Sequence, residues 1–403
     1  MKNCVIVSAA RTAIGSFNGA LATTSAIDLG ATVIKAALQR AQLDPQRVDE
    51  VIMGNVLQAG LGQNPARQAL LKSGLAETVC GFTVNKVCGS GLKSVALAAQ
   101  AILAGQAQDI VVAGGMENMS QAPYLLDAKA RWGYRLGDGR LSDVILRDGL
   151  ICATHGYHMG ITAENVAKEY GISREMQDEL ALLSQQRACR AVDEGKFKEE
   201  TVPIEVKSRK KTVLVERDEY PRKDASLEAL SKLSASFKED GTVTAGNASG
   251  MNDASSGVIL ASEEKARELG LPILARIIST ATVGVEPDIM GIGPVDAVNK
   301  ALKKAGLSLE DMERVEINEA FAAQYLACEK ALNLNREITN VNGSGISLGH
   351  PVGATGIITS MIYELLRERK RYGLVAICAG GGMGTAMVLE ALQKEDQEER
   401  SHV

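Results

Sequence analysis

The chain has 403 residues, of which 45% are hydrophobic and 23% charged, and its formal net charge is -5. This length and composition predict a globular protein with two or three cores of ordinary domain size. The balanced charge argues against nucleic acid and against a membrane surface as partners.

The cysteine pattern indicates reduced thiols. Seven cysteines are spread over the chain and none are arranged as C-x-x-C, which argues against a disulfide framework and against a zinc or other metal site. The apolar run within the first ten residues is too short for a signal peptide and is typical of a first strand. We expect no apolar stretch of 18 residues that would span a membrane. The sequence therefore predicts a cytoplasmic protein.

In chain order, the next predicted elements are a helix over residues 26–40 and a strand over residues 50–53, from the spacing of their apolar residues. Between residues 120 and 248 the composition of the sequence changes. This stretch carries the single tryptophan, polar loops and a predicted helix over residues 175–194. We interpret it as an inserted domain over a core built by the rest of the chain. The charged tail, residues 394–403, is expected to fray.

The chain repeats itself. Apolar positions between Ala37 and Val51 recur between Ala301 and Val315, at a constant offset of 264 (301 minus 37, 315 minus 51). Later in each half, a glycine-rich turn opens a helix, and the strand that follows ends in glycines. Two such halves, each too small to cover both faces of its sheet, should pack against each other through helices.

One cysteine stands where a β-favouring segment turns into a helix, in Asn85-Lys86-Val87-Cys88-Gly89-Ser90-Gly91. Unpaired N–H groups and the positive end of the helix dipole favour the thiolate, the nucleophilic form of cysteine. The flanking glycines leave room for a substrate beside the sulfur. The alternative is a buried, inert cysteine in a tight turn. This turn alone leaves both interpretations open.

A cysteine nucleophile needs a base or a stabilising cation. The candidates are His155, His158 and His350. His350 is the strongest, because it stands among five glycines at a helix start in the second half, where the repeat places the counterpart of Cys88. Pseudo-symmetry would bring the two turns together. The alternative is a structural histidine.

A second thiol, Cys378, ends an apolar strand just before Ala379-Gly380-Gly381-Gly382. Ligand sites lie beyond the carboxyl ends of strands in open α/β sheets, and bare backbone N–H groups can bind an oxyanion. A dinucleotide-binding loop is the weaker alternative, because a strand follows the glycines. Asn318 closes another strand and is placed to donate to an oxyanion, to cap a helix, or both.

Four segments resemble the signature blocks of the thiolases, in the family's order. They are Asn85–Gly91, Asn318–Phe321, Asn342-Gly343 with Gly349–Gly353, and Cys378–Gly384. The resemblance implies an α/β protein with the thiolase fold, in which duplicated βαβαβαββ halves form a five-layered α-β-α-β-α core. It divides the chain into a first half (1–119 and 249–271), an inserted coenzyme A-binding loop domain (120–248) and a second half (272–393).

The resemblance also implies roles for single residues. Cys88 would be the acylated nucleophile, His350 its activator and Cys378 the acid/base. Asn318 with His350 would form one oxyanion hole, and the N–H groups of Cys88 and Gly380 the other. Coenzyme A would bind as a substrate, with no permanent cofactor, along Leu150, His158, Met159, Arg222, Leu233, Phe237, Ala245, Ala248, Ser249, Ala320 and Phe321.

Details such as Asp148-Gly149-Leu150 resemble the short-chain branch of the family. This implies ping-pong condensation of two acetyl-CoA to acetoacetyl-CoA and CoA, usually by a homotetramer. The basic run Lys207–Lys211 and Arg222 are expected to bind the phosphates of CoA. One alternative is a degradative 3-ketoacyl-CoA thiolase of broader chain length. Another, from a different class, is a catalytically silent acyl-CoA or lipid carrier on the same fold.

Overall fold

The computed structural model describes residues 3–105, 109–207, 212–354 and 356–393. The predicted tail and Ser208–Lys211 of the basic run lie outside these residues.

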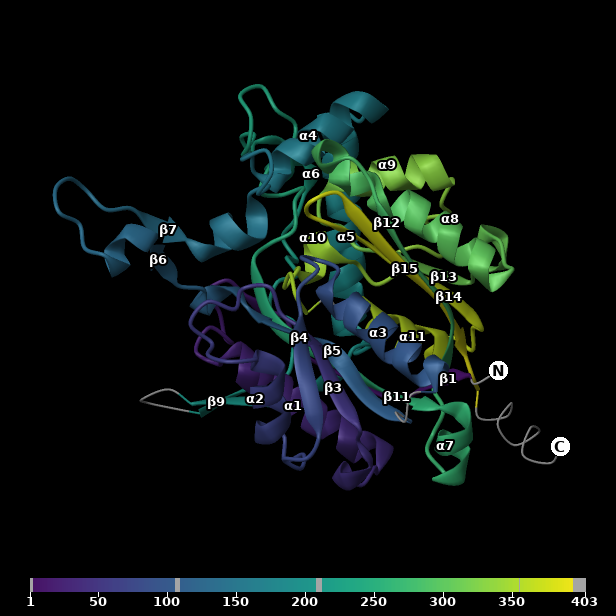
Figure 1. The fold of residues 1–403 in the computed structure, drawn as a ribbon. Coiled ribbons are helices and arrows are strands. Elements are labelled where there is room, and N and C mark those ends of the chain that lie inside the picture. The colour runs from purple at the N-terminus through teal and green to yellow at the C-terminus, as the bar shows by residue number, and fades with distance from the viewer. Residues whose placement is uncertain (1–2, 106–108, 208–211, 355, 394–403) are drawn as a thin grey trace.

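The first half of the chain builds a sheet with helices on both faces (Figure 1). In spatial order its strands are β1 (Cys4–Thr12), β11 (Asn252–Ser262), β5 (Ile110–Asn118), β3 (Glu50–Gly54) and β4 (Cys80–Val84). β11 follows the insert in the chain but pairs antiparallel with both β1 and β5. β3 pairs parallel with β4 and β5. The short strands β2 (Gly15–Ser16) and β8 (Thr201–Val202) pair with β11 and β1.

The second half repeats this order with β12 (Ala275–Gly284), β15 (Met383–Ala391), β14 (Tyr372–Ala379) and β13 (Arg314–Ile317). The offset of the sequence repeat is visible in the structure. Helices α1 (Ala26–Ala41) and α8 (Gly293–Ala305) end 264 residues apart (305 minus 41), and β3 and β13 begin 264 residues apart (314 minus 50). The two sheets join through a short antiparallel contact between β1 and β12.

The helices complete five layers, which confirms the predicted fold class. Helices α1 and α2 (Pro65–Lys72) share a core with the outer face of the first sheet. Helices α3 (Ser90–Ala104) and α11 (Ile357–Arg367) share a core with strands of both sheets and form the middle layer. Helices α8 and α9 (Ala322–Leu332) cover the outer face of the second sheet. Helix α7 (Glu263–Glu268) follows β11.

The middle layer corrects one expectation from the sequence. Residues 87–104, which include α3, are long and apolar enough to meet the length and composition of a membrane span. In the structure α3 packs between the two sheets, where side chains such as Leu92, Val95 and Ile102 are fully buried. A core helix covered on both sides needs this composition.

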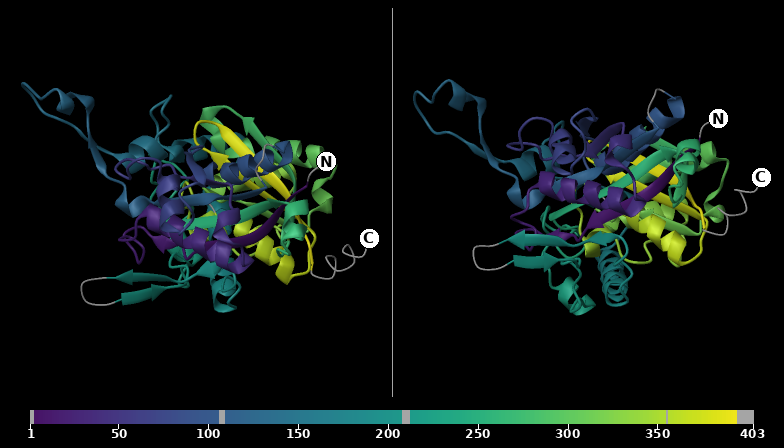
Figure 2. Two further views of the ribbon diagram at one scale, coloured as in Figure 1. Left: turned by 60° about the horizontal axis from the view of Figure 1, so that its bottom comes forward. Right: turned by 90° about the horizontal axis from the view of Figure 1, so that it is seen from below.

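The insert carries helices α4 (Met159–Tyr170), α5 (Arg174–Asp193) and α6 (Leu227–Ser231). It also carries two hairpins that project from the body (Figure 2), β6 (Tyr124–Leu126) with β7 (Leu141–Asp143) and β9 (Ile204–Lys207) with β10 (Thr212–Val215). Short helical turns lie at Pro45–Arg47, Met119–Gln121, Ala128–Arg131, Ile145–Leu150, Pro287–Ile292, Leu309–Asp311 and α10 (Gly345–Leu348).

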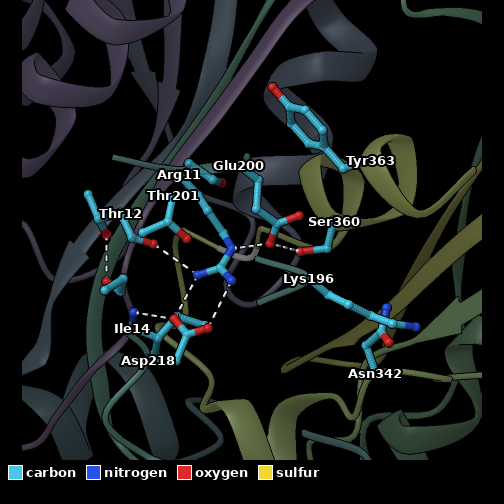
Figure 3. Close-up of polar contacts among 12 residues, drawn as sticks. Arg11, Thr12, Ile14, Lys196, Glu200, Thr201, Asp218, Asn342, Ser360 and Tyr363 are labelled. Carbon is cyan, nitrogen blue, oxygen red and sulfur yellow. Dashed lines mark hydrogen bonds and ion pairs between the residues drawn. The ribbon is translucent and has the colours of Figure 1, made fainter. Parts of the chain in front are cut away.

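A buried ion cluster fastens the insert to the first half (Figure 3). The guanidinium of Arg11, on β1, donates from Nε to Glu200 at 2.5 Å and from Nη1 and Nη2 to Asp218 at 2.7 and 2.8 Å. Ser360 of α11 also donates to Glu200, at 2.8 Å. All three charged side chains are almost fully buried. The cluster therefore joins β1, α11 and two separate segments of the insert.

Candidate active site

Cys88 lies in a tight turn between β4 and α3. Ser90 closes the turn, because its hydroxyl accepts from the N–H of Lys86 at 2.8 Å and donates to the carbonyl of Val87 at 2.6 Å. Val87 has a φ of 49°, which is unusual for a β-branched residue. Strained backbone of this kind persists where the surrounding structure fixes it, often at active sites.

The turn of His350 meets the turn of Cys88 at Gly54. A methyl group on Gly54 would stand 2.7 Å from both the carbonyl oxygen of Gly353 and the backbone nitrogen of Gly91. Cys88 also packs on the apolar cluster that contains Val352. The end of β3 is therefore a glycine because two turns, one from each half, close over it.

His350 is buried and free of protein hydrogen bonds on its ring. Its backbone N–H donates to Asn252 at 2.9 Å, but within the described residues neither ring nitrogen has a partner. Burial lowers the pKa of His350 to about 4, so the imidazole is neutral at physiological pH. A buried, unpartnered neutral imidazole is suited to accept a proton from a thiol.

The other two candidate histidines are already engaged. His158 caps α4, where its Nδ1 accepts from the N–H of Gly160 at 3.0 Å, and its ring stacks on Phe237. His155 lies 3.7 Å from Asp288, with both side chains well exposed, and its Nδ1 is 3.6 Å from the sulfur of Cys152.

The ionisation of Cys88 differs from the expectation of a low pKa. Burial raises the pKa of the thiol to about 11, although the N–H groups of Gly380 and of Cys88 itself, and the charge of Lys86, act in the opposite direction. The helix start therefore contributes less than the loss of hydration. At neutral pH the resting pair is a thiol beside a neutral imidazole.

Cys378 is fully buried near the end of β14 and faces Gly384 of β15 across the ladder. Burial, and next the charge of Cys88, raise its pKa well above the usual value. The turn of Cys88 reaches this part of the sheet, because Nζ of Lys86 donates at 2.9 Å to the hydroxyl of Thr385, the neighbour of Gly384. Gly380 stands two residues after Cys378 in the chain. A Cβ on Gly380 would stand 3.3 Å from side-chain atoms of Val87 and Met159.

Asn318 lies at the end of β13, as predicted, and is 2% exposed. Its N–H donates to Ala376 at 3.0 Å, while its side-chain amide nitrogen has no partner among the described residues. A cavity of about 50 Å³ adjoins it, and this volume is sufficient for a water molecule. The amide is therefore placed to donate to a water or to a ligand oxygen.

Most of the residues predicted to bind coenzyme A lie together in one largely apolar cluster. The rings of His158 and Phe237 stack at 4.6 Å, and Phe237 meets Phe321 edge to face at 6.2 Å. Two backbone contacts fix the neighbouring segments, since Ser249 N–H donates to Ala320 at 2.9 Å and Ala248 pairs with Phe321. Met159 is buried in the same core, while Leu150 packs on the apolar cluster beside Cys88.

The remaining three lie around a separate cavity of about 150 Å³, lined by Arg222, Leu233 and Ala245. The Arg222 guanidinium lies over the Tyr220 ring at 5.7 Å. Lys207 is not part of this cavity, because it lines a groove beside α1. The expectation that Lys207 acts together with Arg222 is therefore wrong, since β9 carries Lys207 away on a projecting hairpin.

Glu117, near the end of β5, was missed in the sequence. Its carboxylate accepts from the N–H groups of Val56 and Leu57 at 2.9 and 3.1 Å and from the Asn55 amide at 2.8 Å. Burial raises its pKa to about 7. Gly353 also donates to it, so Glu117 fixes the turn that carries His350. A carboxylate at the carboxyl end of a buried strand was the signal for it.

Comparisons with known proteins agree with this arrangement. The family model described as "Thiolase, N-terminal domain" matches residues 4–264, and "Thiolase, C-terminal domain" matches residues 271–391. The chain is 67% identical to an acetyl-CoA acetyltransferase of Escherichia coli strain K12, over 97% of this chain and 100% of that protein. It is 54% identical to an acetyl-CoA acetyltransferase of Chromobacterium violaceum, over 96% and 98%. The crystal structure of the Bacillus anthracis acetyl-CoA acetyltransferase superposes with a TM-score of 0.95 at 47% identity, covering 97% of this chain and 99% of that one.

Proposed function

This chain belongs to the thiolase family of acyltransferases, and we propose that it is an acetyl-CoA C-acetyltransferase, which condenses two acetyl-CoA to acetoacetyl-CoA and CoA. The observation that carries the proposal is the meeting of two thiols, Cys88 and Cys378, with the Gly380 N–H directed at the first sulfur. Two thiols are needed because the reaction has two chemically different halves.

In the first half-reaction Cys88 is the nucleophile. His350 takes the thiol proton as the sulfur attacks the thioester carbonyl, and the proton passes to the departing CoA sulfur. The N–H groups of Cys88 and Gly380 are placed to bind the oxyanion. Removing one donor from comparable oxyanion holes costs about 3 kcal/mol. The product is an acetyl thioester on Cys88.

In the second half-reaction Cys378 transfers its thiol proton to His350, and the resulting thiolate removes a methyl proton from a second acetyl-CoA. Acetylation turns Cys88 into a thioester that cannot ionise, so no negative charge on that sulfur opposes the ionisation of Cys378. The enolate oxygen is bound by His350 and by Asn318, directly or through a water. The carbanion attacks the acetyl carbonyl, and the released thiolate of Cys88 regains its proton from the imidazolium of His350.

Coenzyme A is proposed to enter along the His158–Phe237–Phe321 wall, with its nucleotide near Arg222. This places the CoA-binding surface on the inserted domain, residues 120–248, between a first half of 1–119 with 249–271 and a second half of 272–393. The return of β11 into the first sheet supports that division.

We also propose a homotetramer in the cytoplasm. The hairpin of β6 and β7 supports the assembly, because its apolar side chains Tyr124, Leu126, Trp132, Leu136 and Leu141 are exposed, with Leu136 at 100%. Sedimentation should give a tetramer, and a monomer would contradict the assembly. All seven cysteines are free, which supports a reducing compartment.

The decisive experiment is thiolysis of 3-ketoacyl-CoA substrates of increasing chain length. We expect kcat/KM to be highest for acetoacetyl-CoA and to fall steeply for longer chains. Comparable rates on long chains would favour the degradative 3-ketoacyl-CoA thiolase of broader range. The absence of thiolysis on every substrate, together with tight acyl-CoA binding, would favour the silent carrier.

A further inference from the structure

Lys86 reaches across the interface between the two halves. It stands two residues before Cys88 in the turn after β4, and its Nζ donates to the hydroxyl of Thr385 on β15 at 2.9 Å. Thr385 pairs with Ile377 across the ladder, next to the pair formed by Gly384 and Cys378. The side chain thus begins beside one reacting thiol and ends beside the strand of the other.

The ammonium group also lies over the backbone next to the nucleophile. A Cβ on Gly89 would stand 3.6 Å from Nζ of Lys86 and 3.5 Å from the Thr385 hydroxyl. The geometry of the turn holds it there, because the N–H of Lys86 donates to Ser90 and its carbonyl accepts from Gly89 at 3.1 Å. The strained Val87 separates Lys86 from Cys88. The half-buried cation is therefore fixed at both ends.

Both reacting thiols lie within the electrostatic reach of this cation. The charge of Lys86 lowers the pKa of Cys88 and of Cys378, against burial, which raises both. The other charged or titratable groups that act on this part of the site are Lys93 of α3, Glu117 of β5 and Cys328 of α9. Glu117 also reaches the second half, through Gly353, but its negative charge raises the pKa of Cys88 and therefore opposes Lys86.

We propose that Lys86 is a positioning residue that keeps a positive charge where the turn of Cys88 meets the strand next to Cys378, anchored by Thr385, and that it stabilises whichever of the two sulfurs is ionised. This inference rests on the proposed roles of Cys88 and Cys378. It adds an electrostatic partner to a site in which His350 is neutral and supplies no resting positive charge. Since the same cation acts on both sulfurs, it serves both half-reactions.

The proposal has a pH signature. Burial, and then the like charge of Lys93, lower the pKa of Lys86 to about 8. Lys86 is therefore charged below pH 8 and loses its charge as the pH rises through 8. Its effect on thiolate formation is full at pH 7 and disappears near pH 9.5. A purely structural role would give the same loss at both pH values.

The test is the rate at which iodoacetamide alkylates Cys88 in the full-length chain, followed by mass spectrometry at pH 7 and pH 9.5. Lys86→Met should slow alkylation about tenfold at pH 7, the effect of about one pKa unit, and less than about twofold at pH 9.5. Lys86→Arg keeps the charge at both pH values, so it should stay within about threefold of wild type at pH 7 and react faster than wild type at pH 9.5, where Lys86 has lost its charge. Thr385→Val, which releases the anchor but keeps the charge, should slow alkylation about threefold at pH 7.

Lys93→Met is the matched control, because it removes a nearby lysine that is not part of the hydrogen bond between Lys86 and Thr385. It should leave the rate at pH 7 within about twofold of wild type. Glu117 is retained in every variant, so each ratio to wild type compares chains that carry the same carboxyl group. A pH-independent loss in Lys86→Met, or an equal loss in Lys86→Arg, would overturn the proposal. Alkylation needs no acetyl-CoA, so the result does not depend on whether the proposed acetyltransferase activity is found.

Discussion

At the scale of single residues, burial decides the protonation state of the site. The pKa of Cys88 is raised to about 11 and that of His350 is lowered to about 4, in both cases mainly because a buried group loses hydration of its charged form. The resting pair is uncharged. Proton transfer therefore accompanies attack on the thioester, and the thiolate is not stored in advance.

This predicts how alkylation of Cys88 depends on pH. Iodoacetamide reacts with the thiolate, so its rate with wild-type enzyme should rise about a hundredfold or more between pH 6 and pH 9, without a plateau, because the thiol titrates near 11. The measurement is the second-order rate constant at each pH, with the Cys88→Ala variant to correct for the other thiols. A plateau below pH 8 would mean a stored thiolate–imidazolium pair.

The two thiols should separate by the step that each serves. Replacing Cys378 by Ala removes one sulfur and leaves Cys88, His350 and the Gly380 N–H in place. Acetylation of Cys88 should therefore proceed within about threefold of wild type, while condensation falls by at least the 10²–10⁴-fold, roughly, that acid–base groups contribute. Quenched-flow acetylation beside steady-state condensation checks both. Equal losses in the two steps would assign Cys378 a structural role.

The sequence alone located these residues but not their ionisation or their supports. Cys88, Cys378 and Asn318 were predictable, because each follows a strand with a clear apolar pattern. The raised pKa of Cys88 was not, since burial depends on contacts from distant segments. Glu117 and Lys86 act through partners 60 and 299 residues away, which no local pattern reveals.

At the scale of elements, the internal repeat predicted the matching strands β3 and β13 and the matching strands β5 and β14, whereas it did not predict β11 or β12. The counterpart of β4 in the second half is reduced to a single bridge between Val315 and Thr339. The side chain of Asn340 takes over the next ladder positions, since it accepts from the N–H of Ile317 and donates to the carbonyl of Ile317, both at 2.9 Å. A side chain that pairs with the backbone in this way can replace a strand, and the periodicity of apolar residues does not predict it.

The insert gives a prediction of its own. Arg222 lines the cavity proposed for the nucleotide of CoA, so Arg222→Ala should raise the KM for acetyl-CoA about tenfold, the loss of one charged hydrogen bond, and change kcat less. Lys207→Ala is the matched control, because Lys207 is also a basic residue of the insert but lines a different groove. Steady-state kinetics separate the two. An unchanged KM in Arg222→Ala would mean that Arg222 is a solvated surface residue that does not bind CoA.

At the scale of the whole molecule, the site exists only where the two halves and the insert meet. The first half supplies Cys88, the second His350, Cys378 and Asn318, and the middle layer of α3 and α11 holds the sheets together. The buried cluster of Arg11 fixes the insert against this core (Figure 3). The packing of the two halves through helices was predictable from the repeat, whereas the cluster was not, because its members are up to 207 residues apart.

Arg11 should accordingly be critical for stability. Its guanidinium is buried with Glu200 and Asp218, so Arg11→Met leaves two buried carboxylates without their cation. Breaking a buried ion pair in this way costs about 3–5 kcal/mol. The measurement is denaturant-induced unfolding of the full chain at pH 7, monitored by circular dichroism, and the midpoint should fall markedly.

An exposed ion pair gives the comparison that isolates burial as the cause. Lys72 and Asp28 are 2.6 Å apart with side chains 53% and 47% exposed, so Lys72→Met removes the same kind of charge from water-accessible surface. Exposed pairs contribute about 1 kcal/mol or less. A double variant, Arg11→Met with Asp218→Asn, should recover part of the lost stability, because one of the two stranded carboxylates becomes neutral. Equal destabilisation by Arg11→Met and Lys72→Met would show that the cluster does not hold the insert to the core.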